Sequence, residues 1–118
     1  MMARLRDFYC EFLGLQLGPR PPLNSFGYWL YAGQQAVLHI SELRAGETRS
    51  AGRTGTFDHA AFRCDHYETM LGRLRQASIA CRATEPPPLP GAPRQRQIFF
   101  QDPAGNGIEL NFSEQVSE

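Results

Sequence analysis

Two histidines and one glutamate, His39, His59 and Glu109, have the side chains and positions in this 118-residue chain that best fit chemistry at a site. Glu109 lies in an alternating segment, residues 108–112, where Ile108, Leu110 and Phe112 are predicted to share one face of a strand. Glu109 then lies on the other face. Because glutamate is common on the solvent face of a strand, this position alone does not indicate a function.

The segment around Glu109 has an earlier counterpart around His39. Residues 33–41 also pass from a glycine-containing turn into an alternating strand, and His39 occupies the place that Glu109 has later. An aromatic strand, a proline-rich connection and a candidate helix precede both copies. The chain therefore indicates an internal duplication of about fifty residues.

Two imidazoles and one carboxylate on converging strands would make a mixed nitrogen and oxygen site for a divalent metal. That ligand set suits Fe(II), Mn(II), Ni(II), Co(II) or Zn(II) better than Ca(II). Such a site keeps positions open for water and substrate. From the pattern alone, a hydrogen-bonded core histidine and a solvated glutamate stay open as alternatives.

The elements that must position these residues follow from apolar periodicity and from glycine and proline. Helices are predicted over residues 4–13, ended by Gly14, and from 65 to about 77, with Asp65 as N-cap and Glu68 completing a pair like a capping box. Strands are predicted at residues 15–20, 26–31, 36–41, 57–64, 79–83, 95–101 and 107–112.

The second half thus has the order β-α-β-β-β, whereas the first half has only α-β-β-β. The absent strand would be the counterpart of the one that carries His59. We expect this strand to lie upstream of Met1. The alternative is a genuinely short chain in which a partner subunit covers the gap. Either way, one sheet edge is left unpaired. We predict one domain over residues 1–118, with a first module at about 1–42, a polar and mobile linker at about 43–56, and a second module at about 57–113.

Composition excludes several classes of function. The formal net charge is zero and there is no long basic run, so nucleic acid and membranes are not expected partners. All 12 basic residues are arginine, which excludes Schiff-base chemistry on a lysine. Three cysteines without a C-x-x-C pair indicate free thiols, and we expect a cytoplasmic protein.

The duplication resembles the vicinal oxygen chelate superfamily, which contains glyoxalase I, bleomycin-resistance proteins and extradiol dioxygenases. The matching residues are Phe8-Tyr9 followed by Leu13-Gly14-Leu15, then Asp58-His59-Ala60-Ala61-Phe62, and most specifically residues 99–110, Phe-Phe-Gln-Asp-Pro-Ala-Gly-Asn-Gly-Ile-Glu-Leu. The resemblance implies an α+β fold in which two βαβββ modules curl into a half-open barrel, here with the first module lacking its leading strand.

The resemblance also implies the site. Each leading strand and each closing strand of the superfamily supplies one metal ligand. His59 matches the leading-strand ligand of the second module, and Glu109 matches its closing-strand ligand and the proton-transfer base of glyoxalase I. His39 matches the closing-strand ligand of the first module, where glyoxalase I enzymes carry glutamate. The fourth ligand would come from the missing strand.

The implied function is that of a divalent-metal-dependent enzyme acting on a small oxygenated substrate chelated to the metal. Lyase, isomerase or epimerase, dioxygenase and thiol-transferase chemistry stay open, and His39 in place of glutamate argues against a true glyoxalase I. Candidate substrate-binding residues are Tyr28, Tyr31, Arg63 and Arg96.

The alternative is a metal-free small-molecule binding protein of the bleomycin-resistance type, with Tyr28, Trp29 and Tyr31 lining the ligand site. A third possibility is a metal-free subunit whose role is dimerisation. A homodimer is expected in each case, because these modules often complete their clefts by pairing.

Overall fold

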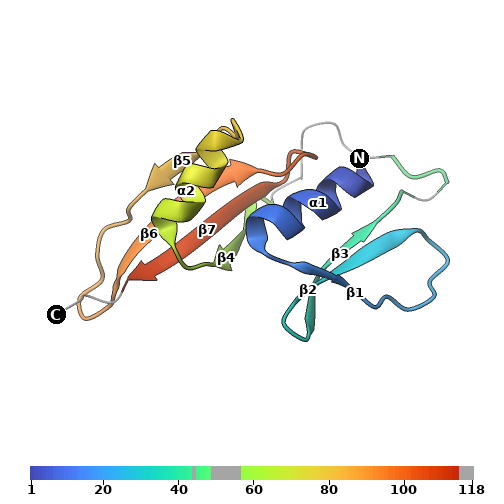
Figure 1. Cartoon of the computed structure of the whole chain (residues 1–118), viewed down its shortest axis with the longest axis horizontal. Coiled ribbons are helices and arrows are strands. Elements are labelled where there is room, and N and C mark those ends of the chain that lie inside the picture. The colour runs from blue at the N-terminus through green and yellow to red at the C-terminus, as the bar shows by residue number, and fades with distance from the viewer. Residues whose placement is uncertain (44, 49–56, 115–118) are drawn as a thin grey trace. The chain divides into compact units, whose positions relative to one another are not determined.

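The computed structural model of the chain describes residues 1–43, 45–48 and 57–114 (Figure 1). The chain forms two compact units, Met1–Gly55 and Thr56–Glu118. Most of the predicted linker lies outside the described residues, and so does the expectation that it is mobile. No helix in the described ranges is long and apolar enough to cross a membrane.

The first unit is one helix on a three-stranded antiparallel sheet. Helix α1 spans Met2–Leu13, and the strands are β1 (Gln16–Gly18), β2 (Gly27–Ala32) and β3 (Gln35–Ser41), in the order β1-β2-β3. The helix lies on the sheet (Figure 1). It buries Phe8 and Phe12, and Leu30 of β2 is fully buried. Gly14 ends the helix with a φ of 68°, as the sequence predicted.

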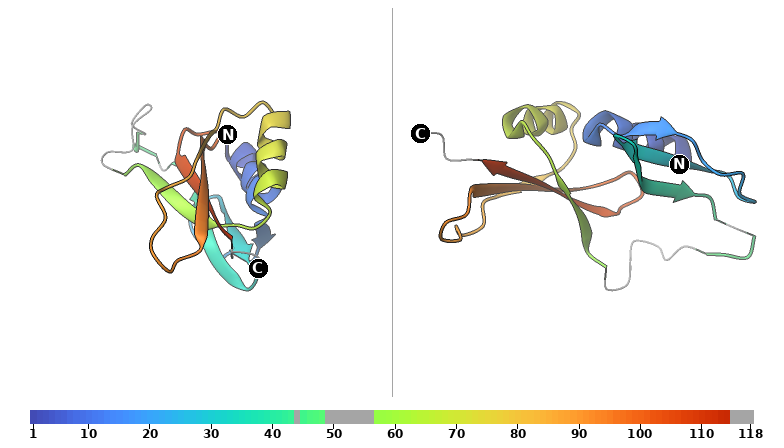
Figure 2. Two further views of the ribbon diagram at one scale, coloured as in Figure 1. Left: turned by 90° about the vertical axis from the view of Figure 1, so that its left-hand side faces the viewer. Right: turned by 90° about the horizontal axis from the view of Figure 1, so that it is seen from below.

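The second unit is a four-stranded sheet with one helix on one face (Figures 1 and 2). Its elements are β4 (His59–Arg63), α2 (Tyr67–Gln76), β5 (Arg82–Thr84), β6 (Arg94–Gln101) and β7 (Gly107–Glu114), and the sheet order is β4-β7-β6-β5. Strand β4 pairs with β7 in parallel, and the other pairs are antiparallel. The helix-facing core contains Leu74, Ile98 and Leu110, each 0% exposed.

The turn between β6 and β7 is closed by a buried carboxylate. Asp102 is 5% exposed, and its Oδ1 accepts hydrogen bonds from the backbone N–H groups of Ala104 and Asn106, both at 2.9 Å. Its Oδ2 accepts from Asn106 Nδ2 at 2.8 Å. Gly105 has a φ of 87°, which strongly favours glycine. This turn sets where β7 begins and so where Glu109 lies along the sheet.

Several boundaries differ from those predicted, and two of the differences have a clear local cause. The cap of α2 is His66, with a φ of 65° and no side-chain cap hydrogen bond, so the prediction of Asp65 as N-cap was wrong. The reason is that Cys64 N–H still bonds to Asn111 O at 2.9 Å, so sheet pairing continues to Cys64 and the chain turns at His66.

The second difference concerns the strand predicted at 79–83, which begins instead at Arg82. Ile79 N–H donates to Leu74 O at 3.0 Å, and Ser78 has a φ of 57°. Ile79 therefore satisfies a carbonyl at the end of α2 and is not available for strand pairing.

The two units differ at the edge of the closing strand. In the second unit, the edge of β7 pairs with the leading strand β4. In the first unit, no strand within the described residues pairs with the corresponding edge of β3. The order α-β-β-β of the first unit agrees with the sequence prediction.

Candidate metal centre

One face of the second sheet gathers its polar side chains in rows that run across the strands. Glu109 of β7 lies between Ala61 of β4 and Phe99 of β6, and His59 lies beside Gly107. The opposite face carries Ile108, Leu110 and Phe112, which are 0–2% exposed, with Tyr67 of α2 packed on Phe112 at 5.3 Å. Alternation along β7 thus puts Glu109 on the face away from the helix.

Glu109 is buried, 8% exposed, and its carboxylate accepts hydrogen bonds from three side chains. Its Oε1 lies 3.0 Å from His59 Nε2. Its Oε2 accepts from Gln97 Nε2 and from Asn111 Nδ2, each at 3.3 Å. Thr84 Oγ1 in turn donates to Gln97 Oε1 at 2.9 Å. The bonds to Oε2 hold the carboxylate so that its other oxygen is directed at His59.

His59 is held from its other ring nitrogen. Asp58 Oδ2 accepts from Nδ1–H at 2.7 Å. The pKa of His59 is raised, first by this hydrogen bond to Asp58 and then by Glu109, against the opposing effect of desolvation. In the imidazolium form, which the raised pKa favours, both ring nitrogens donate: Nδ1–H to Asp58 and Nε2–H to Glu109.

Gly107 allows the two strands to approach closely at this point. A Cβ atom at Gly107 would collide with the backbone carbonyl oxygen of Asp58 and would lie 3.1 Å from the Cβ of His59. Glycine is therefore required here by the close approach of the two strands. Its absent side chain lets β4 lie beside β7 with His59 next to Glu109.

The donor atoms of His59 and Glu109 fit one divalent metal. Two ligands at right angles and about 2.1 Å from an ion are about 3.0 Å apart, and the separation of Nε2 and Oε1 is 3.0 Å. Asp58 supplies the carboxylate partner that metal-bound histidines commonly have on the remaining nitrogen. No group of three or more His, Cys, Asp or Glu side chains that could hold a metal occurs in the described parts of the chain, so His59 and Glu109 are candidate ligands only.

His39 lies in the first unit, on the exposed face of β3. Its ring stacks on Trp29 of β2, with centroids 3.8 Å apart and an interplanar angle of 4°. The two residues are directly opposite each other in the β2–β3 register. That His39 shares an ion with His59 and Glu109 stays a prediction, because it belongs to the other unit.

The two tyrosines predicted to bind substrate have partners within the first unit. Tyr28 Oη accepts from Arg6 Nη1 of α1 at 3.2 Å, and the guanidinium carbon of Arg6 lies 4.9 Å from the ring centroid. Tyr31 Oη donates to Pro19 O at 2.6 Å, and its ring packs against Gly18. Each tyrosine hydroxyl is therefore hydrogen-bonded within the first unit.

The two predicted arginines lie on opposite faces of the second sheet. Arg63 is paired with Asn111 in the β4–β7 register and shares the face of His59. Arg96 lies on the helix side, with its guanidinium carbon 3.8 Å from the ring centroid of Tyr67 and its Nη1 3.3 Å from Glu68 Oε1. The structure therefore brings together His59 and Glu109, with Arg63 on their face and Arg96 on the other.

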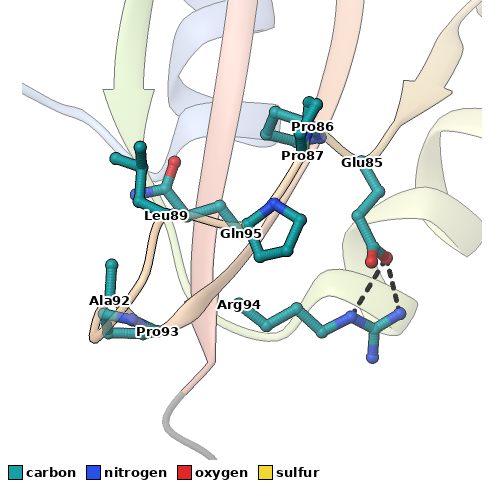
Figure 3. Close-up of a pocket in the computed structure, with 9 residues that line it drawn as sticks. Glu85, Pro86, Pro87, Leu89, Ala92, Pro93, Arg94 and Gln95 are labelled. Carbon is teal, nitrogen blue, oxygen red and sulfur yellow. Dashed lines mark hydrogen bonds and ion pairs between the residues drawn. The ribbon is translucent and has the colours of Figure 1, made fainter.

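Two pockets lie near the ends of the second sheet. One, of about 390 Å³, adjoins the candidate metal centre and is lined by Asp58, His59, Arg82 and Phe99, among others. The other, of about 270 Å³, lies within the proline-rich loop at residues 85–95, which Arg94 closes by donating from Nε and Nη2 to Glu85 Oε1 at 3.0 and 2.6 Å (Figure 3). This ion pair joins the two ends of the loop.

The sheet pairing, the buried carboxylate and the histidine beside it define an α+β protein with a histidine–glutamate pair on the sheet face away from the helix. The family profile described as the Glyoxalase/Bleomycin resistance protein/Dioxygenase superfamily matches residues 1–110. The chain belongs to this superfamily, which confirms the resemblance stated from its motifs. No curated protein sequence matches the chain significantly.

Solved structures show the same fold at low sequence identity. A protein from Bacillus anthracis described as a glyoxalase family member is 23% identical, with a TM-score of 0.63 and coverage of 95% of this chain and 84% of that one. A variant of the fosfomycin resistance protein FosX from Listeria monocytogenes, complexed with Mn(II) and 1S,2S-dihydroxypropylphosphonic acid, is 15% identical, with a TM-score of 0.63 and coverage of 97% and 85%.

An antibiotic binding protein from a Streptomyces species is 22% identical, with a TM-score of 0.60 and coverage of 95% and 86%. These similarities confirm the predicted α+β glyoxalase-type fold.

Proposed function

We propose that this chain is a divalent-metal-dependent enzyme of the superfamily, acting on a small oxygenated substrate that chelates the metal. The observation that carries the proposal is the 3.0 Å separation of His59 Nε2 and Glu109 Oε1, with the carboxylate buried. Burial of a carboxylate is costly unless it is bonded or coordinates a metal. The complex of the FosX variant with Mn(II) supports a metal on this fold.

The residues of the proposed site have two roles, to bind the metal and to transfer a proton. His59 and Glu109 are the ligands of this unit, and a bound divalent metal would polarise vicinal oxygens of the substrate. Asp58 keeps the His59 ring oriented with its proton on Nδ1. Gln97 and Asn111 hold Oε2 of Glu109, so that its carboxylate is positioned to accept a proton from the substrate.

Several finer features of this proposal come from the sequence. His39 stays a predicted third ligand, and the chemistry stays open between lyase, isomerase, dioxygenase and thiol transferase. The cytoplasmic homodimer is likewise a prediction. A well-folded monomer in sedimentation at micromolar concentration would contradict the homodimer.

A second candidate is a metal-free binding protein of the bleomycin-resistance type. The stacked Trp29–His39 pair favours it, because two parallel rings 3.8 Å apart offer a broad aromatic surface for a planar ligand. In that case His39 binds no metal. The similarity of the fold to an antibiotic binding protein supports the same alternative.

Elemental analysis of protein purified without chelator, then supplied with Mn(II), Co(II) or Zn(II), tests the first candidate. We expect about one metal per chain in the unaltered protein, and its loss in His59→Ala and Glu109→Ala. His66→Asn is the matched control, because His66 caps α2 and asparagine tolerates its φ of 65°. Absence of stoichiometric metal in the unaltered protein would contradict the proposal.

A further inference from the structure

The pocket beside the candidate metal centre contains an arginine that the proposed function does not use. Arg82 on β5 lies directly opposite Phe99 in the β5–β6 register, and Phe99 lies directly opposite Glu109 in the β6–β7 register. One row across three strands therefore carries a guanidinium, an aromatic ring and the buried carboxylate. All three side chains share the face away from α2.

The Phe99 ring contacts both Arg82 and His59. The guanidinium carbon of Arg82 lies 4.8 Å from the centroid of the Phe99 ring. The His59 ring meets Phe99 edge to face, with centroids 5.3 Å apart and an interplanar angle of 90°. A cation on an aromatic face is oriented without neutralisation of its charge, so the donors of Arg82 stay available to an anion.

The charges around the pocket favour an anionic ligand at Arg82. Arg82 forms no ion pair with another described residue, whereas Arg94 pairs with Glu85 and Arg96 with Glu68. The lining residues include one carboxylate, Asp58, and that carboxylate is bonded to His59 at 2.7 Å. Arg82 is thus a cation without an ion pair among the described residues, and it lines a pocket of about 390 Å³, which has room for a small molecule.

We infer that Arg82 binds the oxyanion of a small substrate, a carboxylate or a phosphonate, whose remaining oxygens reach toward His59 and Glu109. The part of this inference that directs the remaining oxygens toward His59 and Glu109 rests on the proposed function. Two strand spacings separate Arg82 from Glu109, about 10 Å between backbones, which suits a substrate of a few carbon atoms. The planar guanidinium can donate two parallel bonds to either oxyanion.

The test compares three ligands of one shape on metal-free protein: benzoate, phenylphosphonate and the neutral benzamide, titrated by chemical shifts of backbone amides around the pocket. We expect at least one anion to bind at least about tenfold more tightly than benzamide, as for a charge-assisted bidentate pair. Arg82→Gln should abolish this preference, and Arg82→Lys should restore only part of it. Which anion binds more tightly tells whether the natural group is a carboxylate or a phosphonate.

Arg75→Gln is the matched control, because it removes the same charge from the exposed surface of α2 and should leave the preference intact. Equal binding of anions and benzamide, no binding of any of the three, or an unchanged preference in Arg82→Gln would each overturn the inference. Metal content is measured on the same samples. Metal without an anion preference refutes only this inference, and an anion preference without metal refutes only the proposed function.

Discussion

Glu109→Gln is the substitution that best separates the charge of the buried carboxylate from its shape as contributions to stability. Glutamine keeps the shape of the side chain and removes the charge. The carboxylate oxygens accept from His59, Gln97 and Asn111, and Glu109 is 8% exposed. A glutamine amide has one acceptor oxygen and one donor NH₂ group. Whichever way it is oriented, donor groups face each other on one side of the amide.

An unsatisfied buried donor costs about 1–3 kcal/mol, so we expect metal-free Glu109→Gln to lose about that much free energy of unfolding. Glu109→Ala, which removes all acceptors at this position, should lose at least as much. The control is Glu68→Gln on α2, where an exposed carboxylate is replaced and a change within about 0.5 kcal/mol is expected.

The loss should also depend on pH in a defined direction. The pKa of His59 is raised, chiefly by Asp58 and also by Glu109. A raised pKa in the folded state contributes stability below the unfolded value of about 6.5, and this stability disappears as the pH rises through the folded value. Removing the charge of Glu109 should therefore cost more at about pH 5.5 than at about pH 9.

Urea unfolding midpoints of the three variants and the unaltered protein, measured with chelator at both pH values, check this reasoning. An equal loss at the two pH values would refute the charge interaction between His59 and Glu109. A loss no larger than that of Glu68→Gln would refute the importance of the buried hydrogen bonds.

Three further outcomes are expected. Gly107→Ala should lower both the urea unfolding midpoint and the metal affinity measured by calorimetric titration, because the added Cβ collides with Asp58 O. An unchanged metal affinity would contradict the role of this close approach. Leu110→Ala, at a 0% exposed position, should lose about 2–5 kcal/mol in urea unfolding, and a loss below about 1 kcal/mol would contradict its place in the core. The pKa of the Cys64 thiol is raised by burial and secondarily by Asp65. The pH midpoint of its alkylation rate, followed by peptide mass spectrometry, should therefore lie above that of a free thiol. A midpoint at or below that of a free thiol would contradict the burial of Cys64.

The sequence alone determined the local features of this protein. Alternation in β7 correctly separated Ile108, Leu110 and Phe112 from Glu109, because side chains of any strand alternate between two faces. Gly14 and the Asp102 turn were likewise predictable, because left-handed φ values and short hydrogen-bonding side chains act within a few residues. The duplication and its motifs identified the superfamily and the candidate ligands His39, His59 and Glu109.

Tertiary structure decided which of these residues meet. His59 and Glu109 are 50 positions apart, and the parallel pairing of β4 with β7 brings them to 3.0 Å. The strand registers also place Gln97 where it donates a hydrogen bond to Glu109, and they place Trp29 directly opposite His39.

A local pattern determines the face on which a side chain lies. The neighbouring strand and its register depend on backbone hydrogen bonds and packing between distant segments, which no local pattern specifies. That is why the sequence could propose candidate residues for a site but could not specify the side chains that surround them.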